Sequence, residues 1–479
     1  MKKQPISLLS ALAPIIILVI MLSYNIMVYE DNSLNGSNQF ILLIGGFIAA
    51  LFGFKSSVSY KLMINKIAEN IQSVTGAILI LLFVGALAGT WLISGIIPAM
   101  IYYGLKILNP TFFLPACIIL CAIISLATGS SWTTSATVGI ALIGIGKALG
   151  LPPGMIAGSV ISGAYFGDKL SPLSDTTNLA PAMAGGNLFS HIRYMTITTV
   201  PSIIITLIVF FIIGLIQKST GSSDPESLML AIKEKFNINL LLFLIPITVI
   251  ILIIKKTPPL IALLTGTLLG GLFAIIFQEN LILEISNSNK LTFENSYKTI
   301  INSMTISTQI NTSNDLLNEL FVSGGMSGML NTIWLIICAL VFGGIMDAIG
   351  ALDKISESLL DWAKSTFQLF ASTVASCLTI NLTASDQYLS IVIPGKMFTK
   401  AYKKRNLKPE NLSRTLEDSG TVTSVLIPWN TCGAYQSGVL GVSVLDYFIY
   451  AIFNWLSPFM TLLFAYFKIK IKYISNSKK

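Results

Sequence analysis

Long apolar stretches, separated by short polar loops, make up most of this chain of 479 residues. A helix needs roughly 17–25 apolar residues to cross the hydrocarbon core of a bilayer. The longer stretches lie near 8–28, 39–54, 73–93, 111–127, 195–216, 238–254, 258–277, 328–347, 367–382 and 444–467. Only 11% of the residues are charged, against about 25% in soluble domains. The sequence therefore predicts an all-α polytopic membrane protein with about 10–12 transmembrane helices.

The basic residues gather in alternate loops between these stretches. The loops rich in lysine and arginine lie at 55–66, 255–256, 400–408 and 468–479. By contrast, the loops at 30–31 and 278–325 carry mostly acidic or neutral residues. Because cytoplasmic loops carry the excess of basic residues, we expect both termini in the cytoplasm and the protein in the cell (inner) membrane. These loops account for the net charge of +8, so we expect contact with lipid and not with nucleic acid.

Two parts of the chain echo each other. Residues 128–131 resemble 383–386, and residues 175–176 resemble 430–431 at almost the same separation. The expected segments are N-terminal helices in 1–72, a first repeat in 73–217, middle helices with polar external loops in 218–327, and a second repeat in 328–479. The linker 396–408 is basic and its counterpart near 140–153 is not. Because basic loops face the cytoplasm, the two equivalent linkers should lie on opposite sides of the membrane. This predicts inverted-topology repeats, as in secondary transporters.

Each repeat contains two polar breaks inside its apolar stretches. They lie at 128–137 and 167–178 in the first repeat, and at 383–388 and 417–432 in the second. Interrupted backbone at membrane depth is tolerated only where it is buried in protein or lines a cavity. Carbonyls freed at a break can hold Na⁺, and helix N-termini attract anions. The sequence therefore predicts broken helices and re-entrant hairpins around a binding site.

The carboxylates in these breaks are the first candidates for that site: Asp168, Asp175, Asp386, Glu417 and Asp418. A charge at the bilayer centre costs roughly 2.5–3.5 kcal/mol on insertion scales, so an acid there indicates function. Such a carboxylate can hold a proton or Na⁺ but not both comfortably, which is the basis of exchange. Candidate oxygen ligands nearby are Ser130, Ser174, Thr176, Thr177, Asn178, Asn430 and Thr431. We expect Na⁺ at Asp175, Thr176, Asn178, Asp386, Asn430 and Thr431, and we expect no cofactor.

The basic residues near the breaks leave alternatives open. Asp168 precedes Lys169, and these two can pair with one another. Arg414 lies about one helical turn before Glu417 and Asp418 and can pair with one of them; of the two acids we favour Asp418 as the functional one. The basic side chains that we expect mostly at the membrane interface are Lys169, His191, Arg193, Lys396 and Arg414.

The breaks and their flanks resemble the signature of NhaC-type Na⁺/H⁺ antiporters. The resemblance lies in residues 167–181 and 189–192, and in 383–388, 411–421 and 428–433. It implies Na⁺ extrusion driven by inward proton flow, and so a part in pH homeostasis. It also implies two inverted halves, each with a re-entrant hairpin and a broken helix, commonly assembled as homodimers. Relatives of this family include malate/lactate exchangers coupled to H⁺ and Na⁺, and the signature does not separate the two activities.

Other classes fit the sequence less well. An organic-acid exchanger would need buried cationic side chains for its anion. An intramembrane serine protease is suggested by residues 325–328, but its histidine should follow the serine, whereas His191 precedes it. A channel would not need acids in inverted broken repeats. We therefore expect a transporter and not an enzyme.

Overall fold

The framework of the protein is a set of long apolar helices. A computed structural model describes residues 6–29, 33, 35–107, 109–216 and 225–474. Within these residues, seven helices are long and apolar enough to cross a membrane. They are α1 (Leu8–Tyr29), α2 (Ser37–Lys55), α4 (Thr75–Ile93), α6 (Pro110–Thr128), α11 (Leu188–Ile216), α14 (Pro259–Phe277) and the span Gly325–Ala348, which holds α18 (Gly325–Gly328) and α19 (Leu330–Ala348).

Two helices that meet at a sharp bend make an eighth span when the pair is counted as one. Here α12 (Pro225–Lys235) is followed by the 3₁₀ turn η3 (Leu240–Phe243) and by α13 (Leu244–Ile254), and the bend measures 88°. The expectation of an all-α polytopic membrane protein is thus confirmed. Length and composition alone mark fewer spans than 10–12, because several apolar stretches form shorter helices. One example is 444–467, which forms α25 (Val444–Phe448) and α26 (Ile452–Tyr466).

The polar breaks interrupt helices in both proposed repeats. The helices around the first two breaks are α6, α7 (Ser131–Thr134), the π-helical η2 (Ser135–Gly139), α8 (Ile140–Ala148), α9 (Pro153–Leu170) and α10 (Asp175–Ala184). Those around the other two are α21 (Thr366–Thr383), α22 (Gln387–Lys404), α23 (Pro409–Leu416), the π-helical η4 (Glu417–Thr421), the 3₁₀ turn η5 (Ser424–Leu426) and α24 (Thr431–Leu440). Helices therefore stop and restart where the sequence predicts.

A polar side chain caps the helix that follows each break. Ser130 caps α7 and Asp386 caps α22, 256 positions later, while Ser174 caps α10 and Asn430 caps α24, again 256 positions later. Each cap accepts a hydrogen bond from a backbone N–H of the first helical turn, which would otherwise have no partner. This regular spacing agrees with an internal repeat. The segment boundaries and the inverted orientation stay predictions.

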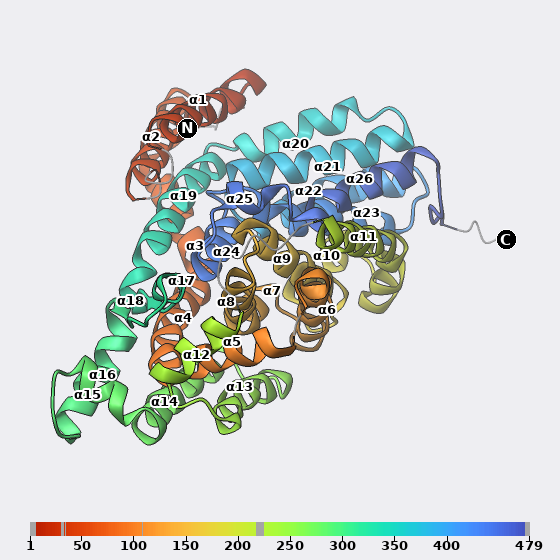
Figure 1. Ribbon diagram of the computed structural model, residues 1–479. Helices are drawn as coiled ribbons and strands as arrows, with labels where there is room; N and C mark the ends of the chain where they lie inside the picture. Colours follow the sequence, from red (N-terminus) through yellow and green to blue (C-terminus); the bar gives the residue numbers. More distant parts are fainter. Residues whose placement is uncertain (1–5, 30–32, 34, 108, 217–224, 475–479) are drawn as a thin grey trace.

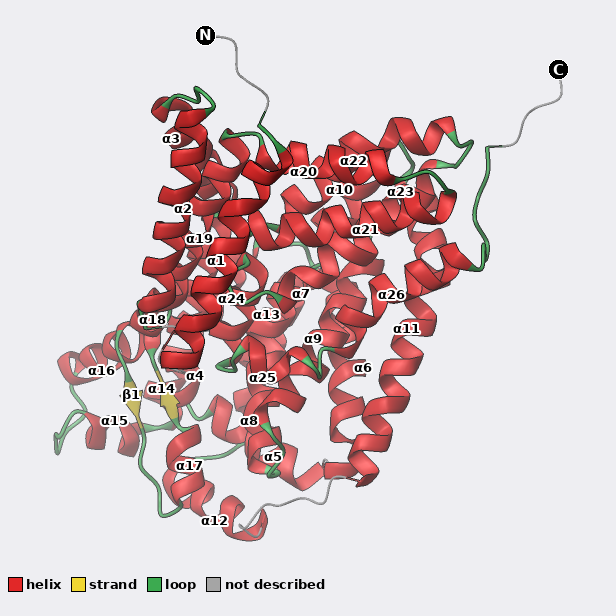
Figure 2. Cartoon of the chain, turned by 90° about the horizontal axis from the view of Figure 1, so that it is seen from above, coloured by secondary structure: helices red, strands yellow, loops and turns green. Residues whose placement is uncertain are grey.

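The remaining elements cover the two ends of the bundle. They are α3 (Tyr60–Ser73), α5 (Ile96–Ile107), α15 (Glu279–Ile285), α16 (Phe293–Thr305), α17 (Asp315–Leu320), α20 (Ala351–Trp362) and the antiparallel pair β1 (Thr308–Gln309) and β2 (Val322–Ser323). Figure 1 shows α20–α23 and α26 on one side of the molecule and α12–α14 on the other, with α6–α10 between them. In Figure 2, α10, α20, α22 and α23 lie at one end, and α12 and α15–α17 lie at the opposite end.

Close packing of α9 on α6 fixes the position of the second break. A Cβ atom on Gly163 would lie 2.3 Å from the Ile118 carbonyl oxygen, and one on Gly167 would lie 2.3 Å from that of Ala122. Two glycines four residues apart let helix backbones approach closely inside a membrane. Ser125 adds a hydrogen bond of 2.6 Å across the same contact, to the Ala164 carbonyl. The end of α9, which carries Asp168 and Lys169, is therefore held against α6.

Candidate functional site

All four polar breaks meet at one cavity of about 520 Å³, called the break cavity below. The remaining wall comes from the junction of α3 with α4 and from the loop between α13 and α14, where Lys256 lies. The candidate residues on the wall are Ser130, Asp168, Ser174, Asp175, Thr176, Asp386 and Thr431. Segments more than 200 residues apart thus contribute to a single polar space.

Left-handed backbone at Gly129 brings the first two breaks together. Gly129 ends α6 with φ of 73°, a conformation that favours glycine. A Cβ atom there would also lie 2.6 Å from the backbone carbon of Leu173. The close approach sets Ser130, at the start of α7, beside the loop that precedes α10.

Asp168 is one of the acids on the cavity wall. Its side chain is 9% exposed. Its Oδ2 atom accepts hydrogen bonds from the Ser131 backbone N–H at 3.1 Å and from the Ser131 hydroxyl at 2.7 Å. Asp168 thus bonds to the first residue of α7 and not to its neighbour Lys169, one of the alternatives left open by the sequence.

Asp386 has one oxygen engaged and one free. Its Oδ1 atom accepts a hydrogen bond of 2.9 Å from the Leu389 N–H and so caps α22. The side chain is 3% exposed, and among the described residues its Oδ2 atom has no hydrogen-bond partner. A buried carboxylate oxygen without a donor needs a cation or a proton to offset its desolvation. Asp386 is therefore a buried acid on the cavity wall that can bind a cation or a proton.

Asp175 lies on the first turn of α10 and faces the same cavity, but it is exposed. Its neighbour Thr176 is 4% exposed and lies 3.2 Å from the Ser174 hydroxyl, oxygen to oxygen. Asp175 thus adds an exposed negative charge to the cavity wall, whereas Asp386 is buried.

Three of the predicted oxygen ligands bond elsewhere. The Asn178 amide is exposed and donates to the Pro172 and Ser174 carbonyls at 2.9 and 2.7 Å. Thr177 donates to the backbone at the end of α9. Asn430 caps α24 and donates to the Asn381 carbonyl at 3.1 Å. None of these three residues is among those on the cavity wall, so they brace the breaks and are poorly placed as ligands.

Asp418 lies in a second, fully buried polar cluster. Its Oδ1 atom accepts from Lys169 Nζ, and both side chains are 0% exposed. Its Oδ2 atom accepts from the Thr198 hydroxyl at 2.9 Å and from the Thr461 hydroxyl. The guanidinium Nε of Arg414 is 4.0 Å away. Asp418 is therefore the acid that pairs with basic residues, and it joins α9, α11, α26 and η4.

Glu417, next to Asp418, is in the opposite situation. Its side chain is 0% exposed, and neither of its oxygens has a hydrogen-bond partner among the described residues. The sequence favours Asp418 over Glu417 as the functional acid. The structure gives Asp418 structural partners and leaves Glu417 without any.

Several basic residues expected at the interface are buried. Lys169, Arg414 and His191 are all 0% exposed. His191 Nδ1 lies 2.7 Å from the Ser413 hydroxyl oxygen, and the guanidinium of Arg414 lies 4.5 Å from the centre of the Tyr194 ring. The interfacial assignment is wrong for these three because each has a partner from a distant segment. The sequence feature that indicates burial is the position of Lys169 inside a polar break.

Comparison with known proteins shows the family to which the chain belongs. The profile of the Na⁺/H⁺ antiporter family matches residues 163–469, which include the second, third and fourth breaks. The chain belongs to this family. Its members are antiporters, so the protein is a multi-pass membrane transporter and not an enzyme, as the sequence predicts.

Relatives with curated names cover most of the chain. The Na⁺/H⁺ antiporter NhaC of Alkalihalophilus pseudofirmus is 39% identical over 88% of this chain and 89% of its own length. The malate-2H⁺/Na⁺-lactate antiporter of Bacillus subtilis is 37% identical over 88% and 86%. NhaC of Bacillus subtilis is 35% identical over 88% and 89%. The resemblance to NhaC-type antiporters is thereby confirmed. The relative named as a malate and lactate antiporter is similar to this chain at an identity between those of the two NhaC proteins.

Proposed function

We propose that the protein exchanges cytoplasmic Na⁺ for external H⁺ by alternating access at the break cavity. The observation that carries the proposal is the free, buried Oδ2 atom of Asp386 on the wall of a cavity that Asp168 and Asp175 also line. Hydroxyl oxygens of Thr176 and Thr431 on the same wall complete a set of hard oxygen ligands, which suit an alkali cation. Na⁺ and H⁺ would compete for these carboxylates.

The charge of the wall favours a cation over an organic anion. Asp168, Asp175 and Asp386 face a single lysine, Lys256, among the described residues on the wall. Lys169 and Arg414 do not line the cavity, and Asp418 already neutralises the first of them. A carboxylate cargo would meet mostly like charge, which is unfavourable in a site of low dielectric.

We further propose that the cavity faces the cytoplasm in this conformation. Lys256 on its wall belongs to a loop that the distribution of basic residues assigns to the cytoplasm. The basic linker after α22 and the polar segment that holds α15–α17 lie at opposite ends of the molecule in Figure 2, as this orientation requires.

Transport in everted membrane vesicles tests the exchange. Addition of Na⁺ should dequench a pH-sensitive dye without any organic acid, and Li⁺, K⁺, malate and lactate are then added separately. Asp386→Asn should abolish dequenching while the protein still inserts into the membrane. Asp361→Asn, at an exposed carboxylate of α20 outside the cavity, is the matched control. Normal turnover of Asp386→Asn, or a strict need for malate or lactate, would refute the proposal.

Asp175→Asn tests a second acid of the same cavity in the same exchange assay. Asp175 is exposed on the cavity wall, and asparagine cannot supply its negative charge. Loss of this charge should therefore also abolish exchange. If only Asp386→Asn abolishes exchange, Asp175 attracts the ion without binding it.

A further inference from the structure

A second cavity, of about 570 Å³, lies along α24, from Pro428 just before the helix to Gly441 just after it. Its wall includes Asn38 at the start of α2, Asn331 at the start of α19, and Ser437 on the last turns of α24. Asp446 on α25 is the single charged side chain among the described residues that line it. The wall thus mixes apolar side chains with amides and hydroxyls, and its single charge is negative, which suits a hydrated cation or hydronium better than an anion.

Both cavities reach the first turn of α24. Thr431, the first residue of α24, lines the break cavity, and Ala434, three residues later, lines the second cavity. Three residues of α-helix rise by roughly 4.5 Å. Pro428, three residues before Thr431, also lines the second cavity. The short segment 428–434 thus has one cavity on each side.

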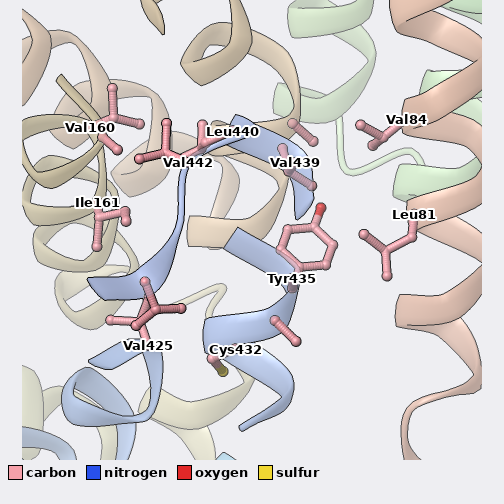
Figure 3. Packing of buried hydrophobic residues seen from close by; sticks show 14 of the residues in the cluster. Leu81, Val84, Val160, Ile161, Val425, Cys432, Tyr435, Val439, Leu440 and Val442 are labelled. Carbon is pink, nitrogen blue, oxygen red and sulfur yellow. The ribbon is translucent and has the colours of Figure 1, made fainter. Parts of the chain in front are cut away.

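Buried aromatic and apolar side chains fill the space at this point. The ring of Tyr435 stacks on that of Trp132, with centroids 4.1 Å apart and an angle of 19° between the planes. Trp132 lines the break cavity, and Tyr435 is 0% exposed. Figure 3 shows Tyr435 pointing from α24 toward Leu81 and Val84 of α4. The Tyr435 hydroxyl also donates to the Trp132 carbonyl at 3.2 Å, which ties α24 to α7.

The positions of the charged loops place the two cavities on opposite sides of the membrane. The break cavity borders Lys256, in a basic loop. The second cavity borders the start of α2, which follows the acidic pair at 30–31, and α2 then runs to Lys55 at the basic side. Basic loops are cytoplasmic, so the second cavity opens to the outside.

We propose that the second cavity is the external vestibule through which a cation or proton reaches the break cavity, and that Tyr435 stacked on Trp132 is the closed barrier between them. The identity of the ions rests on the proposed exchange, but the position of the vestibule does not.

Accessibility of single cysteines from each side of the membrane tests the vestibule. The native cysteines are all buried, so the parent chain gives the background reaction with a membrane-impermeant trimethylammonium methanethiosulfonate. Ser437→Cys should react in right-side-out vesicles and not in everted ones. Ser73→Cys, on the wall of the break cavity, should show the reverse. Reaction of Ser437→Cys from the cytoplasmic side, from both sides, or only after denaturation overturns the assignment.

The barrier is tested by combining Ser437→Cys with a change at Tyr435. Tyr435→Ala removes the ring, so the same cysteine should become reactive from both sides. Tyr435→Phe keeps the ring and loses only the hydroxyl, so reaction should stay confined to the outside. If the alanine variant also reacts only from the outside, Tyr435 is not the barrier. These measurements need no transport, so they can fail while Na⁺/H⁺ exchange holds, and the reverse.

Discussion

Replacing Lys169 by methionine removes one member of a fully buried ion pair and keeps most of the apolar volume. Removal of one partner from such a pair costs about 3–5 kcal/mol, because the other charge stays buried without compensation. In Lys169→Met, Asp418 keeps the hydroxyls of Thr198 and Thr461, and Arg414 Nε is 4.0 Å away. We therefore expect a loss in the free energy of unfolding near the lower limit, about 3 kcal/mol.

Removal of the acid should cost more than removal of the lysine. In Asp418→Asn, both Lys169 and Arg414 lose the carboxylate that neutralises them, and they stay 0% exposed. The expected loss is near the upper limit, about 5 kcal/mol. The double variant, Lys169→Met with Asp418→Asn, leaves only the charge of Arg414 uncompensated. Its cost should therefore fall below the sum of the single costs by about 0.5–3 kcal/mol, the range of coupling between residues in contact.

Unfolding titrations with sodium dodecyl sulfate in mixed micelles, followed by circular dichroism, measure these differences. Lys298→Met is the matched control, because Lys298 bonds to Glu294 at 2.5 Å but both side chains are exposed. Such a surface pair contributes little, so this variant should match the parent. The reasoning is refuted if Lys169→Met is as stable as Lys298→Met, or if the double variant loses the full sum of the single losses.

The other variants test packing, the unpaired acid and the buried histidine. Gly167→Ala would place a Cβ atom 2.3 Å from a backbone oxygen of α6, so the free energy of unfolding should fall by about 1–3 kcal/mol, whereas Gly76→Ala, with open space around it, should not change in the same titration. Glu417→Gln should keep the stability of the parent and flatten the dependence of exchange on pH in everted vesicles, since Glu417 is a buried acid that has no hydrogen-bond partner in the described part of the chain; an unchanged pH profile would exclude it from proton binding. His191→Ala leaves the Ser413 hydroxyl with only its longer bond, of 3.4 Å, to the Glu410 carbonyl, so stability should fall by about 1 kcal/mol; no loss would show that this contact contributes nothing.

The helices and their interruptions follow from local features of the sequence. Apolar length predicts helices such as α4 and α14 to within a few residues, because the bilayer fixes the length of a span. Small polar residues with glycine or proline predict the breaks, because they offer caps to restarted helices. Ser130, Ser174, Asp386 and Asn430 all act in this way.

The division of roles within the breaks does not follow from local features. Lys169 and Asp418 are 249 positions apart, and nothing near either residue indicates the other as its partner. The hydroxyls of Thr198 and Thr461 lie in apolar helices, where they are easily taken for neutral packing residues. Asn430 could equally be a ligand or a cap from its sequence, and only the position of the Cys432 N–H, 3.0 Å from its Oδ1 atom, decides for the cap.

The end of α9 connects the break cavity to the buried ion pair. Asp168 bonds to Ser131 on the wall of the cavity, while Lys169, the next residue, pairs with Asp418 between the two halves of the chain. The Thr177 hydroxyl donates to the carbonyls of both residues, at 3.3 and 3.1 Å, and so holds their backbone against α10. One stretch of backbone therefore carries both an acid of the cavity wall and the lysine of the buried pair. Because breaking such a pair is costly, the pair and the bonds from Thr177 hold this stretch in place beside the cavity.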